Sequence, residues 1–265
     1  MLRAYAVAFL VFLYAPIALL PVFAFNDGTV IAFPLDGFTT RWFAGIFQNP
    51  ELHRALGNSL AVAGAASVIS VALGLAAARA QVRHRWPGKA ATMGLVMLPL
   101  VLPEIIVAVS LLVVLVQVFG WSLSLWALTA AHVLICTPFA IAILNASFRA
   151  LDPALEEAAI DLGETPASTF RLVTLPLVMP GIVAALLITF TISLDEFIIA
   201  FFLTGSDTTL PVYIWSLLRF PRELPVIMAL GTLLVIASVA ILSLAEWNRR
   251  RGVSRAGGRD AGGFL

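Results

Sequence analysis

The chain has 265 residues, of which 61% are hydrophobic and only 12% are charged. Soluble domains are about 45–50% apolar and about 25% charged, so a soluble protein of this composition would carry one large apolar surface. Lys+Arg 16 against Asp+Glu 15 leaves a net charge of +1, which disfavours nucleic acid as a partner, and the single cysteine excludes an intrachain disulfide. The composition predicts a polytopic membrane protein in contact with lipid.

Six apolar stretches meet the length of about 20 residues that a transmembrane helix needs. They cover residues 5–25, 56–78, 93–119, 122–148, 177–204 and 224–245. We therefore expect an all-α polytopic membrane protein with six transmembrane helices. The first stretch is preceded by Arg3, as a signal peptide is, but its apolar run is longer than the 7–15 residues of a signal sequence. We interpret it as a retained membrane anchor.

The distribution of basic residues predicts the orientation of the chain. With the N-terminus in the cytoplasm, the inner segments hold 12 Lys and Arg and the outer segments hold 4. Both termini are therefore expected on the cytoplasmic side. We expect one membrane domain over residues 1–248 and a basic cytoplasmic tail without fixed structure over residues 249–265. Residues 56–80 contain 15 Gly, Ala or Ser, which predicts close packing of this span against a neighbouring helix.

The inner loop between the fourth and fifth spans, residues 149–176, is too long for a simple connector. Asp152 and Pro153 are typical of an N-cap followed by the first helical residue, and Gly163 stands where a left-handed residue ends a helix. Thr165 before a second proline repeats the cap pattern, and Pro176 is expected at the start of the fifth span. The loop thus predicts a helix–turn–helix platform. From the residues alone, it fits either a segment lying on the membrane or a docking surface for a soluble partner.

This platform carries a motif with fixed spacing. Glu157-Ala158-Ala159, then Gly163, then Val173-x-Leu175-Pro176 resembles the EAA motif of ABC-importer permeases, with Val173 in place of the usual Ile. The resemblance implies that the platform is a coupling helix that fits a groove of a separate ATPase subunit. It also implies that Glu157 takes part in docking and that Gly163 forms the turn.

The resemblance extends along the chain and narrows the family to PotC-type permeases of spermidine/putrescine importers. It is carried by residues 37–43, 103–106, 193–196 and 210–216, with Asp195-Glu196 where that family has Asp-Asp. It implies a bacterial inner-membrane complex with a second, PotB-type permease, two ABC ATPase subunits that bind ATP and Mg, and an extracytoplasmic substrate-binding protein. Related permeases import amino-acid derivatives, opines, thiamine or iron, so these substrates remain alternatives.

Three acidic residues lie within the predicted spans, where charge is costly and usually functional. They are Glu104 in the third span and Asp195 and Glu196 in the fifth. At 1.5 Å per residue, Glu104 would lie roughly 16 Å into its helix, near the middle of the bilayer. The acids are candidates for lining a cation pathway. As an alternative, they are structural groups that pair with another subunit or act as protonated hydrogen-bond donors.

Other residues in the spans have structural interpretations. Pro99, Pro103 and Pro138 interrupt the third and fourth spans and predict kinks, which suit gating but are also common in membrane helices. His132 is expected to be uncharged and hydrogen-bonded within the helix bundle.

Two other classes of protein are less consistent with the sequence. An intramembrane enzyme would need a convergent catalytic set, and the chain contains neither H-E-x-x-H nor G-x-S-x-G. A secondary carrier would leave the platform without a purpose. The chain also lacks the G-x-x-x-x-G-K-[ST] sequence of a P-loop, so we expect a transporter subunit that is not an enzyme and needs an ATPase partner.

Overall fold

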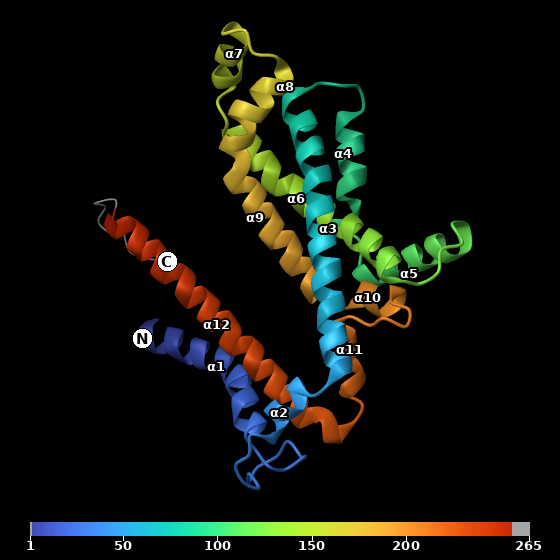
Figure 1. Ribbon diagram of the computed structural model, residues 1–265, viewed down its shortest axis with the longest axis vertical. Helices are drawn as coiled ribbons and strands as arrows, with labels where there is room; N and C mark the ends of the chain where they lie inside the picture. The colour runs from blue at the N-terminus through green and yellow to red at the C-terminus, as the bar shows by residue number, and fades with distance from the viewer. Residues whose placement is uncertain (1, 256–265) are drawn as a thin grey trace. The chain divides into compact units, whose positions relative to one another are not determined.

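The computed structural model describes residues 2–255, and these residues form helices joined by loops, without a β-strand (Figure 1). Five of the described helices are long and apolar enough to cross a membrane, or six if one sharply bent pair counts as a single span. The predicted all-α membrane fold is therefore confirmed. The chain divides into two compact units, Met1–Pro50 with Ile214–Leu265, and Glu51–Tyr213. The single membrane domain proposed for residues 1–248 stays a prediction.

The first unit is built around two long helices, α1 (Leu2–Ala24) and α12 (Leu224–Arg255), which pack side by side (Figure 1). The short helices α2 (Arg41–Phe47) and η4 (Pro221–Glu223) belong to the same unit. Helix α12 continues to Arg255, so residues 249–255 of the predicted unstructured tail are helical, and residues 256–265 lie outside the described residues.

The second unit has three long helices at its centre: α3 (Pro50–Arg83), α6 (Leu125–Ala150) and α9 (Leu175–Asp195). Their shared core contains small and apolar side chains, namely Val71, Ala78, Ala140, Leu144, Phe148, Val178 and Ala185. A Cβ atom at Gly74 of α3 would lie 2.7 Å from the Cβ atom of Ala140 in α6. The predicted close packing of the small-residue span is thus confirmed, and its partner is α6.

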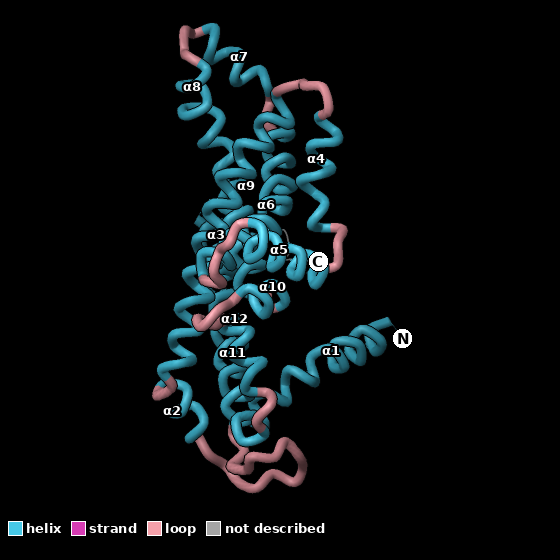
Figure 2. The backbone as a smooth tube through the Cα atoms, turned by 90° about the vertical axis from the view of Figure 1, so that its right-hand side faces the viewer, coloured by secondary structure: helices cyan, strands magenta, loops and turns pink. Residues whose placement is uncertain are grey.

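The third predicted span is broken, which corrects the expectation of one helix over residues 93–119. It consists of α4 (Lys89–Met97), η1 (Leu98–Leu100), α5 (Glu104–Val113) and the π-helix η2 (Val114–Val118). The two halves are bent by 103°, and Figure 2 shows the loop between α4 and α5. Pro103 lacks an N–H and disfavours helical geometry at the preceding residue, which explains the break.

The fourth and fifth spans also differ from their predicted form. Helix α6 runs through Pro138 without interruption, whereas the span predicted over residues 177–204 is divided into α9 and α10 (Ile198–Leu203). Glu196 at the junction has extended backbone angles, φ −67° and ψ 122°. The next helix, α11 (Leu210–Leu217), lies in the region that the sequence predicted as an outer loop.

Candidate functional site

A cavity of about 850 Å³ lies in the second unit, where the α4–α5 break faces the α9–α10 junction. Ile135 and Phe139 of α6 form part of its wall. All three acids predicted from the sequence, Glu104, Asp195 and Glu196, line this cavity. None of the lining residues, all of which lie in the described range, is basic. The cavity therefore combines an apolar wall with carboxylates that a cation could neutralise.

Glu104 reaches the cavity through the broken span. It is the first residue of α5, directly after the bend, and its side chain is exposed. The predicted depth in a continuous helix was wrong, because Pro103 ends the preceding segment and α5 sets off in a new direction. The position at a helix start suits a carboxylate, since the free N–H groups there carry a partial positive charge. The break leaves the carboxylate of Glu104 at the cavity.

Asp195 and Glu196 occupy different environments although they are adjacent. Asp195 is the last residue of α9 and is exposed, whereas Glu196 is 8% exposed. The Oε1 atom of Glu196 accepts a hydrogen bond of 2.7 Å from the N–H of Ile199, and Oε2 accepts one of 2.9 Å from the N–H of Ala200. Glu196 therefore satisfies the first free amides of α10 as an N-terminal cap does.

His132 of α6 is buried beside this cap. Its Nδ1 atom lies 2.7 Å from the Oγ atom of Ser193, and its Nε2 atom lies 3.4 Å from Oε2 of Glu196. Nε2 makes no hydrogen bond in the described part of the chain, so the longer contact is a close approach of the ring nitrogen to the carboxylate. The geometry agrees with the prediction of a hydrogen-bonded His132, but its two neighbours were not expected. Of the three acids, Glu104 and Asp195 are thus exposed at the cavity, and Glu196 is engaged by the protein.

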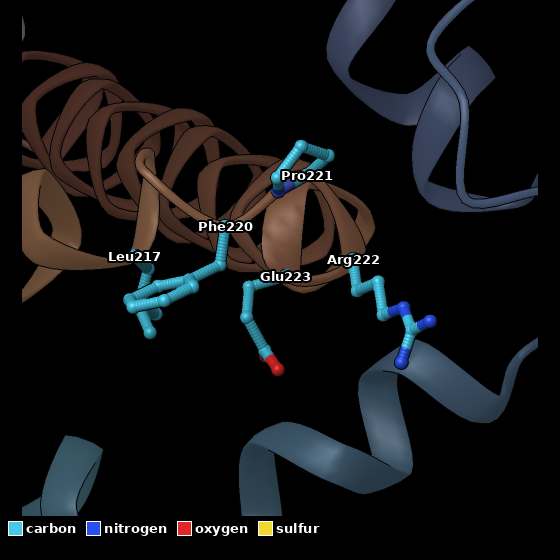
Figure 3. Close-up of a pocket in the computed structure, with 5 residues that line it drawn as sticks. All are labelled: Leu217, Phe220, Pro221, Arg222 and Glu223. Atoms are coloured by element: carbon cyan, nitrogen blue, oxygen red, sulfur yellow. The ribbon is translucent and has the colours of Figure 1, made fainter.

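A second pocket of about 540 Å³ lies in the first unit, between the end of α11 and the start of α12. Figure 3 shows the Phe220 ring next to Leu217, with Glu223 extending into the open space and Arg222 directed away from Phe220. Sequence reasoning did not single out these residues. The described residues contain no group of three or more His, Cys, Asp or Glu that could hold a metal ion.

The predicted platform forms as expected, with α7 (Pro153–Asp161) followed by α8 (Pro166–Thr169). The Asp152 side chain accepts a hydrogen bond from the N–H of Ala154, and the Thr165 side chain accepts one from the N–H of Ser168. Gly163 has a φ of 94°, the left-handed conformation that glycine adopts at low cost.

Two backbone hydrogen bonds complete the end of α7. The N–H of Gly163 donates to the carbonyl of Ile160 at 2.9 Å, and the N–H of Glu164 donates to the carbonyl of Ala159 at 3.1 Å. This pair of bonds is the Schellman arrangement at a helix C-terminus. The role of Gly163 as the turn residue therefore has a clear geometric basis.

The platform joins the membrane helix without a gap, which differs from the expected boundary near Pro176. The π-helix η3 (Phe170–Thr174) continues directly into α9. Pro176 cannot donate to the carbonyl four residues earlier, and its ring crowds that carbonyl, so the preceding turn widens. Leu175 is half-buried and Pro176 is exposed within this continuous helix. The helix backbone thus connects the platform directly to α9.

The residues of the motif divide between an exposed and a buried face. Glu157 and Ala158 are exposed, as is Gly163, while Ala159 is buried. The large apolar side chains of the platform are exposed too, with Leu155 at 47%, Ile160 at 49% and Leu162 at 87%. A surface that combines exposed apolar groups with polar ones is typical of a protein–protein contact.

The motif also has a partly buried neighbour, Glu156, that the sequence did not single out. Its Oε2 atom lies 2.9 Å from Nε of Arg83, at the end of α3. Arg79 and Arg83 are four residues apart and so share one face of a helix, but the sequence carries no signal that this face meets Glu156.

Residues 70–251 match the family described as binding-protein-dependent transport system inner membrane component. The putrescine transport system permease protein PotI of Escherichia coli (strain K12) is 37% identical over 243 residues, covering 89% of this chain and 85% of that protein. The spermidine/putrescine transport system permease protein PotC of Haemophilus influenzae is 34% identical over 241 residues, covering 91% of this chain and 93% of that protein.

Solved structures show the same fold. A chain of a bacterial alginate ABC transporter, in complex with an alginate pentasaccharide-bound periplasmic protein, superposes with a TM-score of 0.71 at 24% identity. The alignment covers 94% of this chain and 93% of that one. A chain of an amino acid ABC transporter matches with a TM-score of 0.56 at 22% identity, covering 80% of this chain and 100% of that one.

Proposed function

The chain belongs to the family of binding-protein-dependent transport system inner membrane components, and from that premise we propose that it forms half of the translocation pathway of an ATP-driven polyamine importer. The observation that carries the proposal is the cavity between the α4–α5 break and the α9–α10 junction, with the exposed carboxylates of Glu104 and Asp195. Similar proteins from other bacteria are named for the transport of putrescine and spermidine.

The chemistry of the cavity fits a polyvalent organic cation. Polyamines carry several ammonium groups on a flexible apolar chain, so carboxylates and apolar side chains together complement them. Glu104 and Asp195 supply the charge, and Ile135 and Phe139 contribute to the apolar wall. Glu196 lines the same cavity, but both its oxygens accept hydrogen bonds from α10. We therefore assign substrate contact to Glu104 and Asp195 and a supporting role to Glu196.

Energy reaches the chain through a separate ATPase subunit. The exposed face of α7, with Glu157, Ala158 and the turn at Gly163, docks in a groove of that subunit. Ala159 lies on the buried side of α7, and Leu175 and Pro176 form the start of α9, where the platform joins that helix. ATP and Mg are bound by the ATPase, and no cofactor is assigned to this chain. Closure of two ATPase subunits would then move the platform and α9 as a rigid-body transition.

The complete transporter requires further chains. We propose a second, PotB-type permease subunit, two ATPase subunits and an extracytoplasmic binding protein. Supporting this assembly, the family is by its description binding-protein-dependent. The binding protein delivers the substrate, and the two permease subunits enclose it.

We propose that both termini lie in the cytoplasm of a bacterial cell, with the chain in the inner membrane. The ion pair between Arg83 and Glu156 supports one part of this topology, because it joins the end of α3, directly before the basic loop, to the platform. Figure 1 also has α7 and α8 at the same end of the second unit as the α3–α4 loop. These two segments must therefore lie on the same side, and the excess of basic residues favours the cytoplasmic side.

Reconstitution tests the proposal directly. The complex of this chain with its partner permease and ATPase subunits is placed in proteoliposomes, and uptake of labelled putrescine or spermidine is measured with the binding protein present. We expect uptake that depends on ATP and on the binding protein. Uptake by this chain alone, without an ATPase, would contradict an ATP-driven mechanism. A titration of the binding protein with polyamines, amino-acid derivatives, thiamine and iron identifies the substrate independently.

A further inference from the structure

Two arginines at the end of α3 contact two parts of the coupling platform, α7 and η3. The Nε atom of Arg83 lies 2.9 Å from Oε2 of Glu156 in α7. One turn earlier, the guanidinium of Arg79 lies 4.1 Å from the centre of the Phe170 ring, at the start of η3. Residues four apart on a helix share one face, so both contacts come from the same side of α3. α3 is thus tied separately to the docking helix and to the segment that continues into α9.

The first of these contacts is enclosed by protein. The side chains of Arg83 and Glu156 are only 19% and 17% exposed. The other carboxylate oxygen, Oε1 of Glu156, accepts a hydrogen bond from the hydroxyl of Thr174, which is fully buried in η3. Glu156 therefore contacts α3 with one oxygen and η3 with the other. A surface salt bridge contributes little because water screens it, but this contact is largely withdrawn from water.

The arginine is not fully engaged in the contact. The Nε and Nη2 atoms of Arg83 are both buried, and neither makes a hydrogen bond within the part of the chain that the structure describes, so the 2.9 Å contact is an ion pair without hydrogen-bond geometry. Guanidinium and carboxylate can pair through two parallel N–H···O bonds, an arrangement that would use both of these N–H groups. The pair therefore has a second geometry open to it without exchanging partners. Such a contact can persist while the helices that carry it shift.

From these contacts we infer that Arg83 and Glu156 form a positioning link that carries displacement of the coupling platform into α3. The inference rests on the proposed function, because it presumes that α7 docks on an ATPase. The backbone leads from the platform to α9 through η3, and to α6 through Leu151 and Asp152. The link adds a path to α3, which has no direct backbone connection to the platform and packs against α6 and α9 in their shared core. Movement at α7 would then reach all three central helices together.

A static brace is the competing interpretation, and it makes a different prediction. If the contact only stabilises the fold, removing it lowers the amount of assembled complex without changing the number of substrate molecules imported per ATP hydrolysed. If the contact transmits movement, removing it leaves assembly intact but lowers the number of substrate molecules imported per ATP. The test therefore measures both quantities for the same preparations.

The experiment uses the reconstituted complex with its partner permease, ATPase subunits and binding protein. Arg83→Ala and Glu156→Gln each remove one side of the contact, and Arg83→Lys keeps the positive charge. The double variant Arg83→Glu with Glu156→Arg restores the pair with its charges exchanged. Arg85→Ala is the matched control, because Arg85 lies two residues later, in the loop that follows α3, and is exposed. The readouts are co-purification of the ATPase, ATP hydrolysis, and labelled putrescine imported per ATP.

We expect Arg83→Ala and Glu156→Gln to retain the ATPase but to import on the order of tenfold less substrate per ATP, a typical size for coupling between sites. Arg83→Lys or the exchanged pair should recover most of the loss, and Arg85→Ala should match the unchanged protein. Loss of ATPase co-purification, an unchanged yield per ATP, or failure of both Arg83→Lys and the exchanged pair to recover the yield would each overturn the link. In those cases the unchanged complex still imports putrescine with ATP, so the proposed function stands. If the unchanged complex does not, the proposed function itself fails.

Discussion

The Nε2 atom of His132 lies 3.4 Å from the carboxylate of Glu196, at the buried margin of the acid-lined cavity. His132 is 1% exposed and is held on its other side by Ser193. Glu196 in turn accepts hydrogen bonds from the N–H groups of Ile199 and Ala200, both of which are buried. The contact therefore joins α6 to the junction of α9 and α10, where the fifth predicted span is divided.

The first prediction concerns the cap at Glu196. Glu196→Ala leaves two buried N–H groups without an acceptor, and each unsatisfied group costs about 1–3 kcal/mol. Glu196→Gln keeps one carbonyl oxygen and should lose less. We expect the temperature of unfolding of the purified complex to fall most for Glu196→Ala and to an intermediate extent for Glu196→Gln.

A substrate contact at Glu196 would give the opposite result. In that case Glu196→Gln would impair polyamine uptake while leaving the thermal unfolding of the complex unchanged. Measurement of both quantities on the same preparation distinguishes the cap from a substrate contact. Glu104→Gln serves as the comparison, because Glu104 lines the same cavity with an exposed side chain.

The second prediction concerns Asp195, whose exposed carboxylate faces the cavity without the buried amides that engage Glu196. Asp195→Asn removes the charge at nearly constant volume. We expect putrescine uptake at low substrate concentration to fall about tenfold, equivalent to ~1.4 kcal/mol, with little change in basal ATP hydrolysis. Asp195→Glu keeps the charge and should retain most of the uptake. An equal loss of uptake and ATP hydrolysis in Asp195→Asn would identify a structural acid.

The sequence predicted the approximate place of the membrane helices, because the length of an apolar stretch decides whether it can span a membrane. The six predicted spans agree with the described helices only when the bent pair counts as one span. The sequence did not predict where those helices break. Pro103 and Pro138 are the same residue type within apolar spans, yet only Pro103 lies at a break. The break in the fifth span needs no proline at all, since the Glu196 carboxylate binds the amides of α10 instead. Such differences depend on tertiary contacts that a single stretch of sequence does not contain.

The platform was the most predictable part of the candidate site. Asp152, Thr165 and Gly163 act on their own neighbours in the chain, so cap and turn patterns read from the sequence have direct structural consequences. The acids of the cavity were identified because charge is costly within a membrane. The sequence did not show that Glu196 is buried while Glu104 and Asp195 are exposed. The pairing of Arg83 with Glu156 was missed because it joins residues far apart in the chain.

The third prediction concerns docking through the exposed face of α7. Glu157→Lys reverses the charge of an exposed residue, and we expect it to abolish ATP-coupled uptake while the chain still reaches the membrane. Gly163→Arg places a side chain on a residue with φ of 94°, which costs roughly 1–2 kcal/mol in backbone strain and adds bulk to the docking turn. Membrane localisation, ATPase co-purification and uptake are measured together. Normal uptake in both variants would rule out a docking role for this surface.

The fourth prediction concerns the contact of α3 with α6. A Cβ atom at Gly74 would lie 2.7 Å from Cβ of Ala140 and 3.2 Å from backbone atoms of Ala140 and Ile141, so any larger residue must push the two helices apart. We expect Gly74→Val to destabilise the complex by about 1–3 kcal/mol or more, the usual cost of overpacking a filled core. Gly57→Ala is the matched control, since a Cβ atom there meets nothing within 4 Å on the same helix. Thermal unfolding of the purified complex measures both, and equal stability of the two variants would show that α3 and α6 can separate without cost. Because backbone atoms of α6 stand in the way, rotation of one side chain cannot relieve the clash, and the effect should persist in Gly74→Ala at smaller size.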